Sequence, residues 1–273
     1  MSETRVVLTA SHLRADAPEV LAELLRRNGV TVAGILAVSV FNLSRFRSLL
    51  RQRGLKPVLQ KAQAALHAAR KLPSDTKAAG SPIAELLAQH DVRPIGLRAW
   101  CRRHRVPLRV VKDLNERSAV NFVTACAPDL VVYSGGGILR ARFLEVAGRV
   151  LNAHAGPLPA IRGMNAAEWS VLLHEPAEVT VHFIDQGIDT GTRIAAFPYA
   201  RLECRTVAHL REATVAVGIE GLLRVILENR FRGVTTEAIP EGFHRQCFIM
   251  APALVEIVQR RLAAESAAHR KLE

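Results

Sequence analysis

Cysteine and aromatic side chains are both scarce in this chain of 273 residues. Its four cysteines, Cys101, Cys126, Cys204 and Cys247, are far apart and include no Cys-x-x-Cys pair. This spacing argues against a disulfide framework or a zinc site and favours a reducing compartment. Aromatic residues make up 5% of the chain, which is too little to support base stacking along single-stranded nucleic acid.

Long apolar runs are also missing. No run approaches the ~20 residues that a membrane-spanning helix needs. Residues 1–5 lack the basic and apolar regions of a secretory signal. With 49% apolar and 23% charged residues, the composition is that of an ordinary globular protein with a sizeable core. We therefore expect a cytoplasmic protein without a transmembrane segment.

Acidic side chains are absent from one stretch of this basic chain, whose formal net charge is +12. Between Ser44 and Leu72 there are eight basic residues and no acidic one. Such a field attracts phosphates, whether on nucleic acid, on a membrane or on a nucleotide-linked small molecule. A solvated helix face is the alternative interpretation. The eight residues are Arg45, Arg47, Arg51, Arg53, Lys56, Lys61, Arg70 and Lys71.

Short apolar runs alternate with segments of helical periodicity along most of the chain. This alternation is typical of βαβ units and predicts an α/β fold with a mostly parallel sheet covered by helices. Predicted strands cover 5–9, 31–40, 108–111, 129–133, 150–151 and 179–184, and predicted helices cover 18–29, 97–104, 119–127, 139–146 and 165–174.

Two segments depart from this alternation. Residues 43–92 contain breaker-rich sequence and two amphipathic patterns, and we interpret them as a basic helical insertion. Residues 203–273 form a predicted helical C-terminal extension, with helices over 207–229 and 251–269, after a main domain over 1–202. The apolar helix faces at Leu222 to Ile226 and Leu254 to Ile257 fit either packing on the sheet or a homodimer contact.

Three consecutive glycines follow the predicted strand that ends at Tyr133. Neither a Gly-x-Gly-x-x-Gly pattern nor a following Lys-Ser or Lys-Thr pair is present, so a phosphate-binding loop is poorly supported. Glycines instead allow a planar ring to approach the backbone closely. Open α/β sheets bind ligands at the carboxyl ends of their strands, where the strand order switches. We therefore expect Ser134 to Gly137 to line a ligand site.

Two polar loops after apolar runs contain the most reactive combination of side chains, Asn152 and His154 in one and Asp189 in the other. Side chains two apart on an extended segment point the same way. An amide and an imidazole aimed at one oxygen can stabilise a developing oxyanion, and a nearby carboxylate can orient the imidazole or relay a proton. The alternative is structural: a lone histidine in a loop and a common Asp-Thr-Gly turn.

No serine or cysteine stands beside these three residues, since Ala155 follows His154. Direct transfer between two bound substrates is therefore favoured over a covalent intermediate.

The motif order Asn-x-His, Leu-Pro, Arg-Gly, Val-Thr-Val-His and Asp-x-Gly-x-Asp-Thr-Gly resembles the formyltransferase family that uses 10-formyltetrahydrofolate. Residues 98–199 carry the resemblance. It implies a Rossmann-like, doubly wound sheet and catalytic roles for Asn152, His154 and Asp189. It also implies 10-formyltetrahydrofolate as co-substrate, without a metal. The implied folate-pocket residues are Gly135, Gly136, Gly137, Ile138 and Leu139 on one wall and Asp185, Gln186, Gly187 and Ile188 on the other.

The family includes enzymes that act on methionyl-tRNA, glycinamide ribonucleotide and amino sugars. The helical tail is too short for the C-terminal β-barrel of the tRNA enzymes. The resemblance therefore favours a small-molecule amine, which could carry phosphate, over charged tRNA as the acceptor of the formyl group. A nucleotide-linked amino sugar or an amino-acid-derived precursor fits this layout. A tRNA-directed enzyme and a non-catalytic folate-binding member stay open as alternatives.

Overall fold

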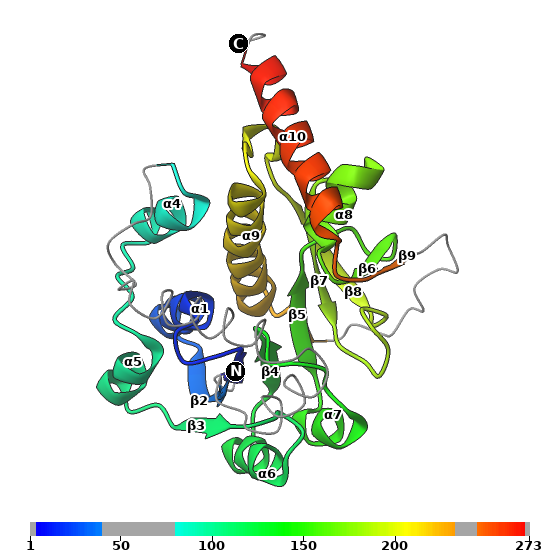
Figure 1. Ribbon diagram of the computed structural model, residues 1–273. Helices are drawn as coiled ribbons and strands as arrows, with labels where there is room; N and C mark the ends of the chain where they lie inside the picture. Colours follow the sequence, from blue (N-terminus) through cyan, green and yellow to red (C-terminus); the bar gives the residue numbers. More distant parts are fainter. Residues whose placement is uncertain (1–3, 40–79, 233–244, 271–273) are drawn as a thin grey trace, which may run out of the picture.

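The computed structural model describes residues 4–39, 80–232 and 245–270 (Figure 1). The basic stretch 45–71 and most of the predicted insertion lie outside these ranges. Within the described part of the insertion, Pro82–Gln89 forms helix α4, with Pro82 in its first turn. The Ser81 hydroxyl caps this helix by accepting a hydrogen bond from the backbone N–H of Ala84.

A seven-stranded sheet organises the described residues in the order β3-β2-β1-β4-β5-β7-β8. The first five strands in that order are parallel, whereas β7 pairs antiparallel with β5 and β8 antiparallel with β7. The strands are β1 (Arg5–Ala10), β2 (Thr31–Val38), β3 (Leu108–Val111), β4 (Leu130–Tyr133), β5 (Val150–His154), β7 (Glu178–Phe183) and β8 (Arg193–Pro198). Successive connections run outward from β1 on one side and from β4 on the other, so the strand order switches between these two strands.

Helices cover both faces of this sheet, as a doubly wound fold requires (Figure 1). Alternating residues of β1 divide between two cores: Val6 and Leu8 pack with α1, α5 and α9, whereas Val7 packs with α6 and α7. The helices are α1 (Asp16–Arg27), α5 (Leu97–His104), α6 (Arg117–Cys126), α7 (Ala141–Ala147), α8 (Ala166–Leu173), α9 (Val207–Leu227) and α10 (Pro252–His269), with a short 3-10 turn, η1 (Arg201–Glu203).

The predicted α/β class and mostly parallel sheet are confirmed. Helix 97–104 and strand 108–111 agree with the predicted bounds, and the other predicted elements differ by a few residues at their ends. One prediction is wrong in a way that matters. The strand predicted at 150–151 continues to His154, so Asn152 and His154 lie on β5 itself rather than in a loop after it.

Three strands were not predicted. β8 lies at the edge of the main sheet, while β6 (Ile161–Gly163) and β9 (Arg245–Cys247) form a separate parallel pair. The C-terminal segment therefore contains a strand as well as its two predicted helices. This pairing places residues 161–163 beside residues 245–247, which lie far apart in the sequence.

Helix α9 is packed against the sheet, where it contacts β5, β7 and β8 and also α1 and α4. Its residues Ile219, Leu222 and Ile226 belong to the same buried cluster as Leu8 and Leu151. The apolar face at Leu222 to Ile226, for which the sequence allows either packing on the sheet or a homodimer contact, thus packs on the sheet. A domain boundary at residue 202 stays a prediction, and so does a homodimer.

We predict that Leu222→Ala lowers the free energy of unfolding by about 2–5 kcal/mol, because it leaves a cavity in this core. Leu222 is 4% exposed and Leu227, on the same helix, is 38% exposed. Leu227→Ala is therefore the matched control, with a loss of less than about 1 kcal/mol. Chemical denaturation of both variants, followed by circular dichroism, measures the difference. Equal losses in the two variants would contradict the packing of α9 on the sheet.

Candidate active site

Strand β5 presents Asn152 and His154 at the seam between the parallel and antiparallel parts of the sheet. Asn152 lies beside Tyr133 of β4 and opposite His182 of β7, and His154 lies opposite Thr180. Asn152 is partly buried, whereas His154 is 6% exposed. The period of two along the strand puts both side chains on one face, as the sequence spacing predicts.

His182 holds the side chain of Asn152. The Asn152 Nδ2 atom lies 3.1 Å from His182 Nε2, and His182 Nδ1 lies 2.7 Å from the carbonyl oxygen of Phe183. Because a carbonyl oxygen only accepts, the neutral ring carries its proton on Nδ1 and Nε2 accepts from the Asn152 amide. One amide N–H of Asn152 is thereby engaged and the second stays available for another acceptor.

His154 and Asp189 face each other. His154 Nε2 lies 2.9 Å from the carbonyl oxygen of Ile161 and therefore donates its proton there. The other nitrogen, Nδ1, lies 3.4 Å from Oδ2 of Asp189. In the neutral imidazole, Nδ1 carries a lone pair, so two acceptor atoms meet across this gap. The pair can accept one proton between them.

The carboxylate of Asp189 is held from a third side by strand β6. The backbone N–H of Gly163 donates to Asp189 Oδ2 at 2.7 Å. Asp189 Oδ1 lies 3.7 Å from Nε2 of His182. A loop residue is thus fixed against both histidines, with its own backbone in the left-handed region at φ 52°. The structure brings the three predicted catalytic residues together and adds His182 to them.

His182 is the last residue of the Val-Thr-Val-His motif, but the sequence does not predict it as a site residue. The signal that could have found it is the antiparallel pairing of β5 with β7, which puts residue 182 opposite residue 152. That pairing depends on tertiary structure and cannot be read from local periodicity.

Burial keeps both imidazoles neutral. It lowers the pKa of His154 from its ordinary value, although Asp189 and the Ile161 carbonyl act in the opposite direction. It also lowers the pKa of His182, to about 4, with the neighbouring His154 as the next largest cause. Each neutral ring offers one donor and one acceptor, and this fixes the hydrogen-bond directions described above.

The glycine triplet lies at the switch between β1 and β4, as expected from the sequence. Thr9 on β1 donates through Oγ1 to the carbonyl oxygen of Gly135 at 2.9 Å and accepts from the Ser134 N–H at 3.0 Å. Gly135, Gly136 and Gly137 have φ of 96°, 130° and 106°, values that side chains rarely tolerate. A Cβ on Gly136 would lie 2.6 Å from Leu114 Cδ1. The loop therefore requires glycine.

The two apolar residues after the triplet have different surroundings. Ile138 is 75% exposed, whereas Leu139 is buried in the core beneath α7. The second predicted wall, Asp185 to Ile188, is a turn in which Asp185 Oδ1 accepts from the N–H of Gly187 and from the Thr190 hydroxyl. Gln186 is exposed, as is Ile188 at 46%. Ile138 and Ile188 are the apolar side chains that these two loops present to the surface.

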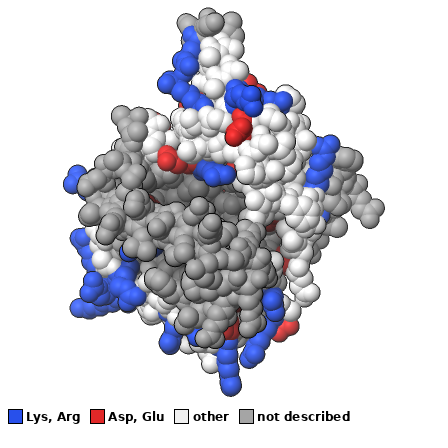
Figure 2. All heavy atoms as spheres, in the orientation of Figure 1, with Lys and Arg blue, Asp and Glu red and all other residues white. Residues whose placement is uncertain are grey.

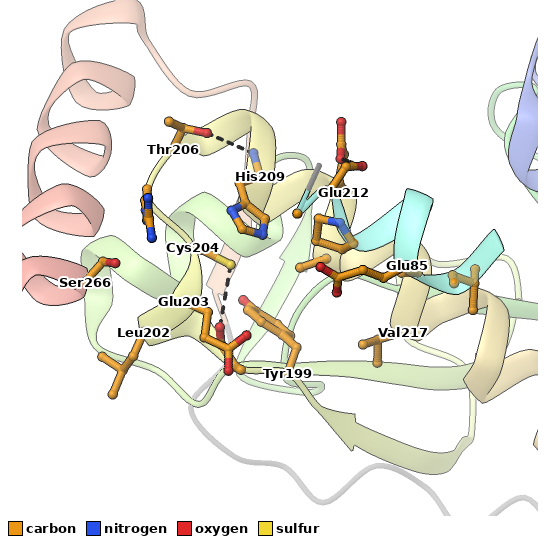
Figure 3. Close-up of a pocket in the computed structure, with 18 of the residues that line it drawn as sticks. Glu85, Tyr199, Leu202, Glu203, Cys204, Thr206, His209, Glu212, Val217 and Ser266 are labelled. Atoms are coloured by element: carbon orange, nitrogen blue, oxygen red, sulfur yellow. Dashed lines mark hydrogen bonds between the residues drawn. The ribbon is translucent and has the colours of Figure 1, made fainter. Parts of the chain in front are cut away.

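The described residues also line an open cavity of about 1030 Å³ between α4, η1, α9 and the end of α10 (Figure 3). Its lining includes Glu85, Glu203, Glu212 and His209, but none of the predicted catalytic residues. We locate the chemistry at β5 because the hydrogen-bonded amide, imidazoles and carboxylate converge there. Among the described residues, no group of three His, Cys, Asp or Glu side chains is placed to hold a metal ion.

Residues 59–226 match the family model described as formyl transferase. The match covers more than half of the chain and all of the convergent side chains. The chain belongs to the formyl transferase family. The resemblance predicted from the motifs is confirmed, and the confirmed fold is the one that the resemblance implies.

Curated relatives of this chain include methionyl-tRNA formyltransferase of Anaeromyxobacter sp. (strain K), which is 30% identical over 160 residues that cover 54% of this chain and 51% of the relative. The methionyl-tRNA formyltransferase of Chlorobium chlorochromatii (strain CaD3) is 29% identical over 130 residues, 45% of this chain and 41% of the relative. The chain thus spans about half of the length of the curated relatives that it matches.

Solved structures share the fold. A sugar N-formyltransferase from Shewanella sp FDAARGOS_354 is 13% identical with a TM-score of 0.52, covering 95% of this chain and 87% of that chain. Glycinamide ribonucleotide transformylase 1 from Symbiobacterium toebii is 19% identical with a TM-score of 0.55, covering 87% and 92%. At these identities the likeness concerns the fold alone. No helix in the described part of this chain is long and apolar enough to cross a membrane.

We predict a pH-dependent stability that originates from His182. Its folded-state pKa of about 4 lies below the ordinary value of about 6.5. Between these values the unfolded chain binds a proton that the folded chain does not, so stability falls as the pH decreases through this window. His182→Gln removes up to about 1.4 kcal/mol per pH unit of that slope. Urea unfolding at several pH values measures it, and an unchanged slope would contradict a neutral buried ring.

Proposed function

We propose that this protein is an N-formyltransferase, which moves a formyl group from 10-formyltetrahydrofolate to the amine of a small molecule. The observation that carries the proposal is the convergence of Asn152, His154 and Asp189 around His182 at the end of strand β5. Asp189 Oδ2 lies 3.4 Å from His154 Nδ1, and His182 holds Asn152 beside them. Family membership supports the same chemistry.

The two loops beside this group suit the folate. The glycine loop follows Tyr133, which neighbours Asn152 in the sheet. Because three glycines replace side chains there, the flat face of a pterin ring can approach the backbone. Ile138 and Ile188 would contact its apolar surface, each from one loop. When bound, 10-formyltetrahydrofolate supplies an activated formyl group, which needs no metal.

Asn152 supplies the electrostatic part of the mechanism. A neutral acceptor amine attacks the formyl carbon, and negative charge develops on the formyl oxygen. The free N–H of Asn152 is the donor for that oxygen, held in place because its other N–H is bound to His182. The Nε2 proton of His154 is donated to the Ile161 carbonyl, and Nδ1 has no proton to donate, so in this proposal Asn152 contributes more directly than His154 to holding the oxygen.

His154 and Asp189 supply the proton acceptor. The attacking nitrogen gains a positive charge and must lose a proton before the carbon–nitrogen bond to the folate breaks. The gap between His154 Nδ1 and Asp189 Oδ2 can take that proton, since both atoms carry lone pairs. The proton then passes to the departing folate nitrogen, which leaves tetrahydrofolate and a formamide as products. No covalent enzyme intermediate is needed.

The acceptor that we propose is a small amine, such as a nucleotide-linked amino sugar or an amino-acid-derived precursor. It is supported by the solved structures that share the fold, which include a sugar N-formyltransferase and a glycinamide ribonucleotide transformylase. The compartment that we propose is the cytoplasm, since all four cysteines are free and buried.

Charged tRNA is the second candidate acceptor. The curated relatives are methionyl-tRNA formyltransferases. Figure 2 also shows Lys and Arg side chains gathered where Figure 1 places α5, the helix that carries Arg98, Arg102 and Arg103. A basic surface of this kind tracks a phosphate backbone. A non-catalytic folate-binding protein is disfavoured because His154 faces Asp189 and His182 holds Asn152 beside them.

We predict that Asn152→Ala lowers kcat by about a hundred- to a thousandfold, as loss of one oxyanion donor does. Asp189→Asn and His154→Ala remove the proton acceptor and lower kcat by at least about a hundredfold. Release of tetrahydrofolate measures the rate. Asp91→Asn is the matched control, because Asp91 is exposed and its φ of 46° is also left-handed. Near-normal turnover in His154→Ala and Asp189→Asn would refute the catalytic assignment.

An acceptor screen tests the substrate class. Purified protein is incubated with 10-formyltetrahydrofolate and separate amino sugars, nucleotide-linked amino sugars, amino acids or charged tRNA, and mass spectrometry reads the added formyl group. We expect formylation of a small amine that persists at moderate salt. Formylation of charged initiator tRNA alone, with activity that decreases steeply as salt rises, would establish the second candidate instead.

A further inference from the structure

Arg162 lies between the two backbone groups that hold the catalytic residues. On one side, the carbonyl oxygen of Ile161 accepts a hydrogen bond from His154 at 2.9 Å. On the other side, the backbone N–H of Gly163 donates to Asp189 at 2.7 Å. No other side chain in the described part of the chain is flanked on both sides by such contacts. The backbone of Arg162 is therefore fixed relative to the reacting groups.

The direction of the Arg162 side chain follows from its strand. Ile161 is fully buried in a small cluster with Ala166 and Cys247, so it points toward α8. Because side chains alternate along a strand, Arg162 leaves the opposite face of the β6–β9 pair. It is partly buried there.

Among the described residues, the Nε atom of the Arg162 guanidinium is buried and has no hydrogen-bond partner. Arg193, which lies opposite His182 in the sheet, is paired with Glu178 instead. A buried charged donor without an acceptor is costly. Such a group next to a reaction centre indicates a ligand that brings the missing acceptor.

The chemistry of that ligand follows from the donor. A guanidinium presents its N–H groups as a planar fork that matches carboxylate and phosphate oxygens. Met164, Phe248 and Ile249 are exposed apolar residues at the same end of the β6–β9 pair, with exposures of 55%, 70% and 75%. A molecule with an anionic group and an apolar part would cover both features.

We propose that Arg162 anchors an anionic group of the formyl acceptor, a carboxylate or a phosphate, and so sets the acceptor amine beside Asn152 and Asp189. This inference rests on the proposed formyl transfer. It adds that the acceptor is an anion. In this proposal the backbone of strand β6 positions His154 and Asp189, and the side chain of Arg162 positions the substrate.

The kinetic test compares Arg162→Gln, Arg162→Lys and the wild type with the acceptor found by the screen. Loss of a charge-assisted hydrogen bond raises the acceptor KM about ten- to a hundredfold in Arg162→Gln. The KM for 10-formyltetrahydrofolate changes less than about twofold, and Arg162→Lys lies between the two because it keeps the charge without the fork. Arg142→Gln, on the exposed surface of α7, is the matched control. Equal changes in both KM values would overturn the proposal.

A binding test separates this proposal from the proposed function. Thermal unfolding midpoints are measured in sodium phosphate, pyrophosphate and acetate at constant ionic strength, for wild type, Arg162→Gln and Arg142→Gln. We expect one anion to raise the midpoint of the wild type and of Arg142→Gln but not of Arg162→Gln. Phosphate and acetate distinguish a phosphate-bearing acceptor from a carboxylate one. Equal shifts in all three proteins, or none, would overturn the role of Arg162 even if formyl transfer is found. An Arg162-dependent shift without formyl transfer would instead reject the proposed function alone.

Discussion

The candidate site depends on one short strand that contacts both His154 and Asp189 through its backbone. In β6 the Ile161 carbonyl accepts from His154 and the Gly163 N–H donates to Asp189. This arrangement requires β6 to pair closely with β9. Gly163 has φ of 93°, and a Cβ there would lie 2.2 Å from the Cys247 carbonyl oxygen. Any other residue at position 163 would push the strands apart and move the N–H away from the carboxylate.

Burial then determines which atoms carry protons. Around Asp189, two imidazoles are kept neutral by their surroundings, and each donates to a backbone carbonyl through one nitrogen. Their remaining nitrogens are acceptors, one facing the Asn152 amide and the other facing the carboxylate. In a site of low dielectric, hydrogen bonds of this kind are strong and their directions are well defined. The fold therefore specifies a donor and a proton acceptor without any charged side chain except Asp189.

Local sequence patterns predicted the elements whose signals are local. Strand β1 is a short apolar run, and helix α5 ends in basic residues before Val106-Pro107, so their positions agree with the structure. The predicted strand at 150–151 is shorter than β5, because the polar residues Asn152 and His154 interrupt the apolar pattern within the strand. Strands β6 and β9 have three residues each and are defined by their pairing with each other, which local sequence does not reveal. The prediction of Asn152, His154 and Asp189 as catalytic residues rests on motif order, whereas the contact of His182 with Asn152 depends on the register of β5 with β7.

The pairing of β6 with β9 also has a consequence for how the molecule is made. Residues 161–163 leave the ribosome long before residues 245–247, yet each of these strands has the other as its partner. The strands of the main sheet are all complete by Pro198, so a nascent chain can form that sheet early, as domains do during synthesis. In that order, the hydrogen bond from Gly163 to Asp189 forms only after the main sheet that holds Asp189 nearby.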